Sequence, residues 1–355
     1  MTRQPRRPAN KGSPATEVPV MADVARLAGV SSMTVSRVLS GYPGVRQETR
    51  ARVEEAIGAL GYRVHTAART LAGGSSGTIG VISVGASHYG PSSTVFSIAA
   101  AAREFDRSTT VVILAKIGEG SIRQAIEHLQ STHVEGIIVN AFVQTAVDAL
   151  SRIDTDLPLV VLCGDQAPGH PSVAVDQRAG ARLATRHLLE LGHATVHHVR
   201  GPSGWIDAAG RAAGWREELG SWGRRPPRAH TGDWSAQSGY AAGQRIAADP
   251  SITAVFVAND HMALGVLRAL HEAGRRVGDD VSIVGFDDIA ESAFSIPPLT
   301  TVRQDFDTVG REGLSLLLRA IDGRAGDTHI TVEPRLIVRN STDAATSARR
   351  RAPTG

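Results

Sequence analysis

Several polar and aromatic side chains lie directly after strand-like runs, where they could bind a small polar molecule. The runs AVFVAND, VSIVGFDD and TVRQDF contain Asn259, Asp287 and Gln304 at their ends. In open α/β folds, ligands bind at the carboxyl ends of the strands. Asn, Asp and Arg side chains can pair with adjacent hydroxyls, and an indole can cover the apolar face of a sugar ring. Asn259 and Asp287, with Arg211 and Trp234, therefore predict a site for a sugar-type ligand.

Other roles compete for some of these positions. Trp234 also fits a core tryptophan, because this residue type is often buried. Asp260 could cap the helix MALGVLRALHEAG, and Asp288 is better explained as a helix cap or a hydrogen-bond acceptor at a strand end. Trp234 is therefore kept among the predicted ligand contacts, whereas Asp260 and Asp288 are not.

The sequence predicts neither a metal site nor a catalytic site. Cys163 is the only cysteine, which excludes an internal disulfide and a multi-cysteine metal site. The clustered histidines lack nearby carboxylates, and two neighbours on one strand point to opposite faces. They are His187, His193, His197 and His198. No dinucleotide-binding glycine motif, phosphate-binding loop or nucleophile elbow occurs, and the adjacent Asp287 and Asp288 cannot readily flank one glycosidic bond. We expect a binding protein without a cofactor, not an enzyme.

The elements around these residues predict a two-lobed α/β body. Four strand-like runs precede Asp176 and at least three follow it, with amphipathic helices such as RAGARLATRHLLELG between them. This alternation is typical of parallel sheets with crossover helices, and the series is too long for one sheet. We predict two doubly wound parallel lobes over residues 78–342 with a ligand cleft between them. The first lobe takes residues 78–175 and 305–333, and the second takes 176–304 and 334–342.

Residues 18–62 predict a small all-α domain of the helix-turn-helix type. Gly29 suits a tight turn that needs a positive φ, and Ser31 suits the N-cap of the second helix. The apolar residues expected to share one buried face are Val24, Ala25, Leu27, Val35, Val38 and Leu39.

The second of these helices has the side chains needed to read DNA. Ser32 and Met33 lie in its first turn, and Arg37 follows one turn later on the side of Met33. Such residues face base edges in the major groove, where an arginine can bind guanine with two hydrogen bonds. The residues expected to contact phosphates are Thr34, Ser36, Arg46, Arg50 and Arg52.

The distribution of charge supports a DNA-binding head on a larger body. Residues 1–75 hold 11 of the 38 Lys and Arg residues but only 5 of the 35 Asp and Glu residues. A basic head on a mildly acidic body indicates that the head meets a polyanion. Residues 1–17 and 343–355 are expected to be disordered, and residues 63–77 to be a linker. Without a signal-like or membrane-spanning apolar segment, we expect a cytoplasmic, nucleoid-associated protein that does not bind membranes.

Several long motifs, in order, resemble the lac repressor family of bacterial transcription regulators. The head carries DVARLAGVSSMTVSRVLSG, then V-x-x-x-T-R-x-x-V, LGY and AxxLAG. The body carries GDWSAQSGY, VANDHMALG, RVGDDVSIVGFDD and IPPLTTVRQDF, so the resemblance covers residues 18 to about 340. It implies a periplasmic-binding-protein-like body and a homodimeric repressor that leaves a pseudo-palindromic, double-stranded operator when a sugar binds.

The resemblance also implies roles for individual head and hinge residues. Ser32, Met33 and Arg37 match base-reading positions. Ala68 and Leu71 match a hinge helix that forms on DNA and inserts a leucine into the minor groove. The usual Pro-Asn before this hinge is replaced by Val64-His65, so the cost of ordering the hinge differs here.

In the body, the resemblance implies a set of effector contacts. The matching residues are Arg211, Trp234, Asn259, Asp287, Gln304 and Phe306, with Asp207 beside them and residues from His88 to Pro91 opposite. The family's carboxylate after the fourth body strand falls on Cys163, beside Gly164 and Asp165. Asp207 replaces a serine-type contact and His88 an apolar one. We therefore expect a mono- or disaccharide other than a galactoside.

Two further hypotheses share the fold. A corepressor-type regulator would use a purine or a phosphorylated sugar to strengthen DNA binding, with the opposite sign of response. An exported sugar-binding protein would need a signal sequence in place of residues 1–75, and the basic head argues against it. The segment after Asn340 contains no leucine heptad, so we expect a homodimer as the largest assembly.

Overall fold

The structure is a computed structural model in which the chain divides into two compact units between Ser76 and Gly77. The predicted hinge residues Ala68 and Leu71 lie outside the described residues, as does Asp165. The described residues are 19–39, 42–62, 75–85, 87–115, 117–164, 167, 169–324 and 329–345.

The first unit is a three-helix domain built around a small apolar core. Its helices are α1 (Met21–Ala28), α2 (Ser32–Leu39) and α3 (Gln47–Leu60). Gly29 closes α1 with a φ of 63°, a conformation that favours glycine. The Ser31 hydroxyl accepts a hydrogen bond from the backbone N–H of Thr34 at 3.2 Å, so Ser31 caps α2 as predicted.

The predicted core of this unit needs one correction. Val24, Ala25, Val35 and Val38 are buried, but 56% of Leu27 is exposed. The buried stripe of α1 is centred near Ala28, which lies between the directions of Val24 and Ala25 on a helix turning 100° per residue. Leu27 therefore points away from the core.

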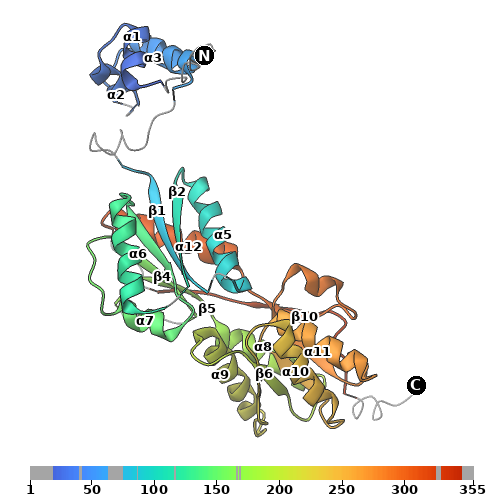
Figure 1. The fold of residues 1–355 in the computed structure, drawn as a ribbon. Helices are drawn as coiled ribbons and strands as arrows, with labels where there is room; N and C mark the ends of the chain where they lie inside the picture. The colour runs from blue at the N-terminus through green and yellow to red at the C-terminus, as the bar shows by residue number, and fades with distance from the viewer. Residues whose placement is uncertain are drawn as a thin grey trace, which may run out of the picture. The chain divides into compact units, whose positions relative to one another are not determined.

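The second unit begins with lobe 1, a sheet covered by helices on both faces (Figure 1). Helices α5 (Tyr89–Glu104) and α12 (Phe306–Ile321) pack on one face, and α6 (Glu119–Ser131) and α7 (Gln144–Leu150) on the other. Its parallel strands are, in sheet order, β11 (His329–Val332), β5 (Ser172–Val175), β4 (Leu159–Leu162), β3 (Gly136–Asn140), β1 (Thr78–Val84) and β2 (Ser108–Leu114).

Lobe 2 repeats this architecture. Helices α8 (Gln177–Glu190) and α9 (Ile206–Ser221) pack on one face, and α10 (Ala236–Ala247) and α11 (Asp260–Glu272) on the other. A 3₁₀ helix, η1 (Ala290–Phe294), follows β9. The strands are, in sheet order, β12 (Arg335–Ile337), β10 (Thr300–Arg303), β9 (Ser282–Asp287), β8 (Ala254–Val257), β6 (His197–Arg200) and β7 (His230–Thr231).

The predicted class, a helix-turn-helix head with two doubly wound α/β lobes, is confirmed with two corrections. Five strands precede Asp176 instead of four, because the short run SVAV forms β5. Lobe 2 is not wholly parallel, since β12 pairs with β10 in the antiparallel direction. The run SVAV was missed because it is short and includes a serine and an alanine, which are weaker strand formers than β-branched residues.

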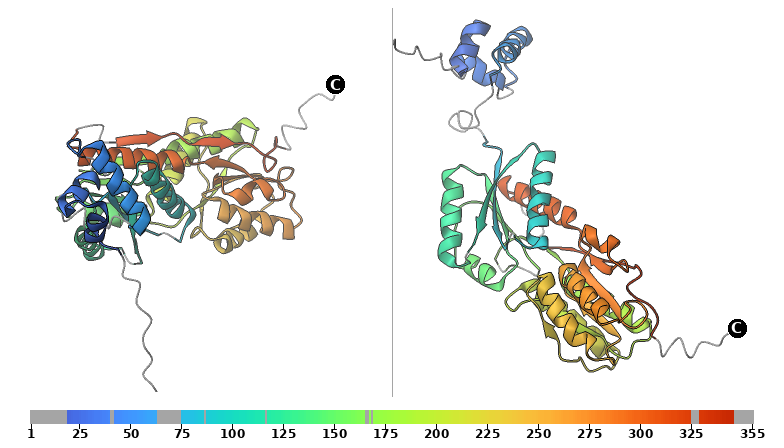
Figure 2. Two further views of the ribbon diagram at one scale, coloured as in Figure 1. Left: turned by 90° about the horizontal axis from the view of Figure 1, so that it is seen from above. Right: turned by 45° about the vertical axis from the view of Figure 1, so that its right-hand side comes forward.

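The chain passes between the lobes three times. It crosses after β5, after β10, and between β11 and β12, which run from one lobe into the other (Figure 2). Two of these crossovers place Gln177 and Gln304 at the junction of the lobes. Within the described part of the chain, no helix is long and apolar enough to cross a membrane.

Candidate functional site

The outward face of α2 brings together the residues predicted to read bases. Ser32, Met33 and Arg37 are all exposed, whereas Val35 and Val38 on the opposite side are buried. The Arg37 guanidinium carbon lies 5.5 Å from the centre of the Tyr42 ring. The helix therefore presents one polar and one apolar face, as a recognition helix must.

The residues predicted to contact phosphates are placed less uniformly. Thr34 and Ser36 are half-buried. Arg50 donates hydrogen bonds to the carbonyl oxygens of Val38 at 3.5 Å and Tyr42 at 3.1 Å. Arg50 thus ties the segment after α2 to α3. These bonds use part of its donor capacity, and its phosphate contact stays a prediction.

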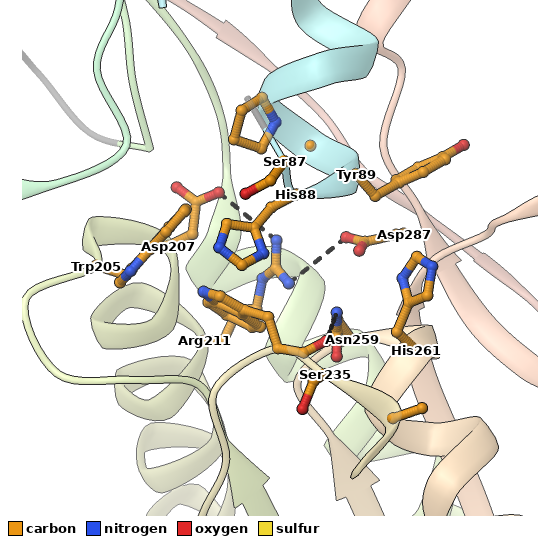
Figure 3. A pocket seen from close by; sticks show the side chains of 14 residues that line it. Ser87, His88, Tyr89, Trp205, Asp207, Arg211, Ser235, Asn259, His261 and Asp287 are labelled. Atoms are coloured by element: carbon orange, nitrogen blue, oxygen red, sulfur yellow. Dashed lines mark hydrogen bonds and ion pairs between the residues drawn. The ribbon is translucent and has the colours of Figure 1, made fainter. Parts of the chain in front are cut away.

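A cavity of about 410 Å³ lies between the two lobes at the carboxyl ends of the strands (Figure 3). Lobe 1 contributes the start of α5, and lobe 2 contributes α9 and the loops after β7, β8 and β9. Its lining residues are Ser87, His88, Tyr89, Gly90, Pro91, Trp205, Asp207, Arg211, Trp234, Ser235, Ala236, Asn259, His261 and Asp287.

Arg211 is the charged centre of the cavity. Its guanidinium lies 3.6 Å from Asp207 Oδ2 and 3.5 Å from Asp287 Oδ1, so the two carboxylates flank it (Figure 3). It also donates to the carbonyl oxygen of Ala258 and lies 3.9 Å from the centre of the Phe286 ring. Only 3% of Arg211 is exposed, so solvent screens these interactions weakly.

A hydrogen-bond chain joins this centre to two of the crossovers between the lobes. Arg211 Nε donates to Gln177 Oε1 at 2.8 Å, and Gln177 Nε2 donates to Gln304 Oε1 at 2.9 Å. Gln304 Nε2 then donates to Asp287 Oδ1 at 2.7 Å. The side chains that face the cavity are therefore bonded directly to the segments that connect the lobes.

Two predicted effector contacts lie elsewhere. Gln304 and Phe306 line a neighbouring cavity of about 910 Å³, which shares Tyr89 and Asp287 with the first one. Gln304 is buried behind Asp287 and holds its carboxylate, while the Phe306 ring packs edge-on against Tyr89 at 5.9 Å. Both residues support the wall of the first cavity from outside.

Burial changes the acidity of the two carboxyl groups. Removal from water raises the pKa of Asp207 to about 6, and the positive charge of Arg211 acts in the opposite direction. The pKa of Asp287 rises to about 7 for the same reason, again opposed by Arg211. Burial and the nearby guanidinium therefore act in opposite directions on the charge of both carboxyl groups.

Aromatic rings form the apolar walls of the cavity. The rings of Trp205 and Trp234 lie 5.7 Å apart and nearly perpendicular, and His88 meets Trp205 edge-on at 5.0 Å. Trp234 has a φ of 76°, and a side chain at Gly201 would collide with its indole. Trp234 is buried, as expected for a core tryptophan, and it also forms part of the cavity wall.

Two residues of the cavity wall each hold a buried polar atom without a hydrogen-bond partner among the described residues: Asp207 Oδ1 and Trp234 Nε1. Unpaired buried polar atoms are uncommon and costly. A Cβ at Gly164 would collide with the Asp207 carboxylate. The Asp207 carboxylate, from lobe 2, therefore lies beside Gly164 of lobe 1. Gly164 directly follows Cys163, the position at which the family pattern has an acid.

Neighbouring acids and amides have mainly structural partners. Asn259, not Asp260, caps α11, accepting from the backbone N–H of Met262 at 3.0 Å. Its amide donates to the carbonyl oxygen of Trp234 at 3.1 Å. Asp260 instead accepts from Ile289, Ser292 and Thr301, and Asp288 accepts from Arg303 and Arg339. The described residues contain no cluster of three side chains suited to a metal.

Sequence reasoning missed several cavity residues. Tyr89, Trp205, Ser235 and His261 line the cavity but were not predicted individually. Each lies within two residues of a predicted contact, namely His88, Asp207, Trp234 or Asn259. A wider window around each motif would have found them, because loops at strand ends present consecutive residues to a cleft.

A helix-turn-helix unit followed in the chain by a two-lobed body with a polar cavity defines a class: DNA-binding regulators of transcription with a ligand-binding domain. Comparison with known proteins agrees with this class. Residues 20–65 match the family described as bacterial regulatory proteins, lacI family. Residues 185–342 match the periplasmic binding protein-like domain.

Individual relatives cover nearly the whole chain. The lactose operon repressor of Escherichia coli (strain K12) is 36% identical over 90% of this chain and 89% of its own length. The lac repressor dimer bound to operator and the anti-inducer ONPF superposes with a TM-score of 0.85 at 35% identity, covering 92% of this chain and 100% of that one. The transcriptional regulator CelR–cellobiose complex superposes with a TM-score of 0.67 at 29% identity, covering 91% of this chain and 99% of that one. The chain belongs to the lacI family of bacterial transcription regulators.

Proposed function

We propose that this chain is a dimeric repressor of sugar-utilisation genes, released from its operator when a mono- or disaccharide binds between the lobes. The observation that carries the proposal is that two residues of the cavity wall, Asp207 and Trp234, hold buried polar atoms, Oδ1 and Nε1, with no partner among the described residues. One accepts and the other donates a hydrogen bond, and both residues border an aromatic-walled space. A hydroxyl-bearing ring satisfies such a combination.

The cavity chemistry supports a neutral sugar as the ligand. Its volume of about 410 Å³ falls in the range of small-molecule sites. Trp205 and Trp234 supply faces for the apolar side of a sugar ring, and Arg211 and Asp207 supply planar groups for adjacent hydroxyls. One relative of the chain was solved as a complex with cellobiose, which supports the same ligand class.

The head supports operator binding as a dimer. A relative was solved as a dimer bound to operator, and a two-fold dimer reads a pseudo-palindromic site with one recognition helix per half-site. In this proposal Ser32, Met33 and Arg37 contact bases. The remaining proposed DNA contacts are Thr34, Ser36, Arg50, Ala68 and Leu71.

The proposed switch is a change in the relation of the two lobes. A ligand shifts a conformational equilibrium only if it binds one state more tightly. A sugar that pairs with Arg211 and Asp287 competes with the contacts that these residues make to Gln177 and Gln304 at the crossovers. Sugar binding therefore favours a different lobe arrangement, which separates the two hinges and weakens their hold on DNA.

Reciprocal titration tests this switch. A thermal-shift screen of sugars, sugar phosphates and purines first identifies the ligand, because ligands that bind the folded state raise its Tm. Isothermal titration of that sugar, with and without a saturating operator duplex selected from a random library, should show an affinity weakened about 5- to 150-fold by the operator. Equal affinities would contradict induction. A purine or phosphorylated sugar that tightens DNA binding would support the corepressor hypothesis instead.

The Trp234→Phe variant tests the unpaired donor. Phenylalanine keeps an aromatic face but removes the indole N–H, so we expect the sugar affinity to fall about 5-fold, the value of one ordinary hydrogen bond. Trp222→Phe is the matched control, because Trp222 is exposed near the end of α9 and does not line the cavity. An unchanged affinity in Trp234→Phe, measured by titration, would contradict this role.

A further inference from the structure

Lobe 2 carries a further cavity, of about 730 Å³, which is distinct from the two described above. It lies between α9, the loop that leads from β6 to α9, and the segment that leads into β7. Three arginines from three different segments line it: Arg200 at the end of β6, Arg216 on α9, and Arg228 just before β7. We refer to this cavity as the arginine groove.

The positive charge of the arginine groove is not neutralised by nearby acids. None of its lining residues is an acid, and none of the three arginines forms an ion pair with any residue that the structure describes. On the adjoining surface, by contrast, Arg178 pairs with Glu217 and Arg186 with Glu218. Within the described part of the chain, the Arg200 guanidinium donates only to hydroxyls, those of Thr231 at 3.2 Å and Ser203 at 3.5 Å. The groove therefore concentrates cationic donors in a partly enclosed space.

Apart from the hydroxyls of Ser203 and Thr231, the remaining side chains of the lining are apolar. Helix α9 presents Ala208, Ala209 and Ala212 to the groove, and these small side chains leave space beside the helix. Trp205 and Trp215, with Pro226 and Pro227, add further apolar surface. Guanidinium groups bind phosphate with paired hydrogen bonds, whereas alanine, proline and tryptophan surfaces suit a carbon skeleton.

We propose that the arginine groove binds a phosphorylated small metabolite, with its phosphate held by Arg200, Arg216 and Arg228 and its organic part against the alanine and proline wall. A partly enclosed groove of this size suits a small ester better than a macromolecule. The occupant is therefore distinct from the sugar in the cavity between the lobes.

The groove also adjoins the effector cavity. Trp205 lines both spaces, and the segment that carries it bonds to lobe 1. The backbone N–H of Gln144 donates to the Gly204 carbonyl oxygen at 3.1 Å, and that of Ile206 donates to the Phe142 carbonyl oxygen at 3.0 Å. A ligand in the groove holds this segment in place. This step rests on the proposed function: if the cavity between the lobes binds a sugar, a ligand in the groove raises the sugar affinity because it preorganises Trp205.

Titration of the full chain with glucose 6-phosphate and with inorganic phosphate, at equal ionic strength and without sugar or DNA, tests the site. We expect saturable binding of glucose 6-phosphate, with a Kd of about 1 mM or tighter, and weaker binding of inorganic phosphate. The double variant Arg216→Ala/Arg228→Ala should weaken binding at least about 10-fold, because each charge-assisted hydrogen bond contributes substantially. Arg224→Ala is the matched control, since Arg224 is exposed on the same lobe and does not line the groove.

Three outcomes overturn the site: no saturable binding, the same Kd in the double variant, or equal Kd values for the ester and inorganic phosphate. The second outcome would place the ester elsewhere, including the cavity between the lobes. Coupling is measured separately, as a several-fold rise in sugar affinity when glucose 6-phosphate is present. Because the phosphate titration needs no sugar, the groove and the proposed sugar response can fail independently.

Discussion

The Arg211→Lys variant is expected to bind the sugar about 100-fold more weakly than the wild-type protein. The guanidinium simultaneously reaches Asp207, Asp287 and the carbonyl oxygen of Ala258, and its Nε donates to Gln177. A lysine ammonium keeps the charge but cannot reproduce this planar fork. Loss of two charge-assisted hydrogen bonds costs about 3 kcal/mol, which corresponds to the expected factor.

Isothermal titration with the screened sugar measures this loss. Arg268→Lys is the matched control, because Arg268 is exposed on α11 and pairs only with Glu272 among the described acids. Circular dichroism and Tm establish that both variants are folded. A sugar affinity within about threefold of wild type in folded Arg211→Lys would show that Arg211 does not organise the ligand site.

The Arg37→Ala variant is expected to lose about 10- to 100-fold of its operator affinity and its preference for one base of each half-site. Arg37 is exposed on the same face of α2 as Met33. A single arginine fork onto guanine contributes about 1–3 kcal/mol of discrimination. Met33 cannot replace that discrimination, because a thioether is only a weak hydrogen-bond acceptor.

Fluorescence anisotropy on the selected operator, on single-base variants and on random duplex, at two salt concentrations, measures both effects. Arg52→Ala serves as the contrast, because Arg52 is exposed on α3 and was predicted to contact phosphate. It should weaken binding uniformly across sequences and reduce the salt slope by about one. If Arg37→Ala behaved in this uniform way, its predicted role in reading bases would be wrong.

The sequence determined the class of this protein because local signals carry that information. The alternation of β-branched runs with amphipathic helices predicted two doubly wound lobes, and the comparisons confirm that fold. Motif position relative to strand ends was enough to predict that Asn259 and Asp287 face a cleft, because parallel strands in each lobe present their carboxyl ends to it. Arg211 lies within α9 and was predicted from its side-chain chemistry and the family resemblance instead. The periodicity of α2 correctly separated its buried residues, Val35 and Val38, from its exposed ones. The exposed residues are Ser32, Met33 and Arg37.

Other assignments depended on contacts between distant parts of the chain. Gln304 follows a strand like the other predicted contacts, yet it lies behind Asp287 because Gln177 from another crossover bonds to it. Arg50 turns toward the end of α2, a partner that only the packing of α3 supplies. Leu27 is exposed because the buried face of α1 is set by what α2 and α3 present to it, not by hydrophobicity alone.

The position of Asp207 in the cavity wall also depends on tertiary structure. Cys163, Gly164 and Asp165 left open which residue replaces the acid of the family pattern. The structure brings Asp207 of α9 against Gly164, across a sequence separation that no local pattern can bridge. Its unpaired Oδ1 and the unpaired Trp234 Nε1 depend equally on that packing. Composition and periodicity determine which elements form, whereas the direction and partners of a buried polar side chain depend on how those elements meet.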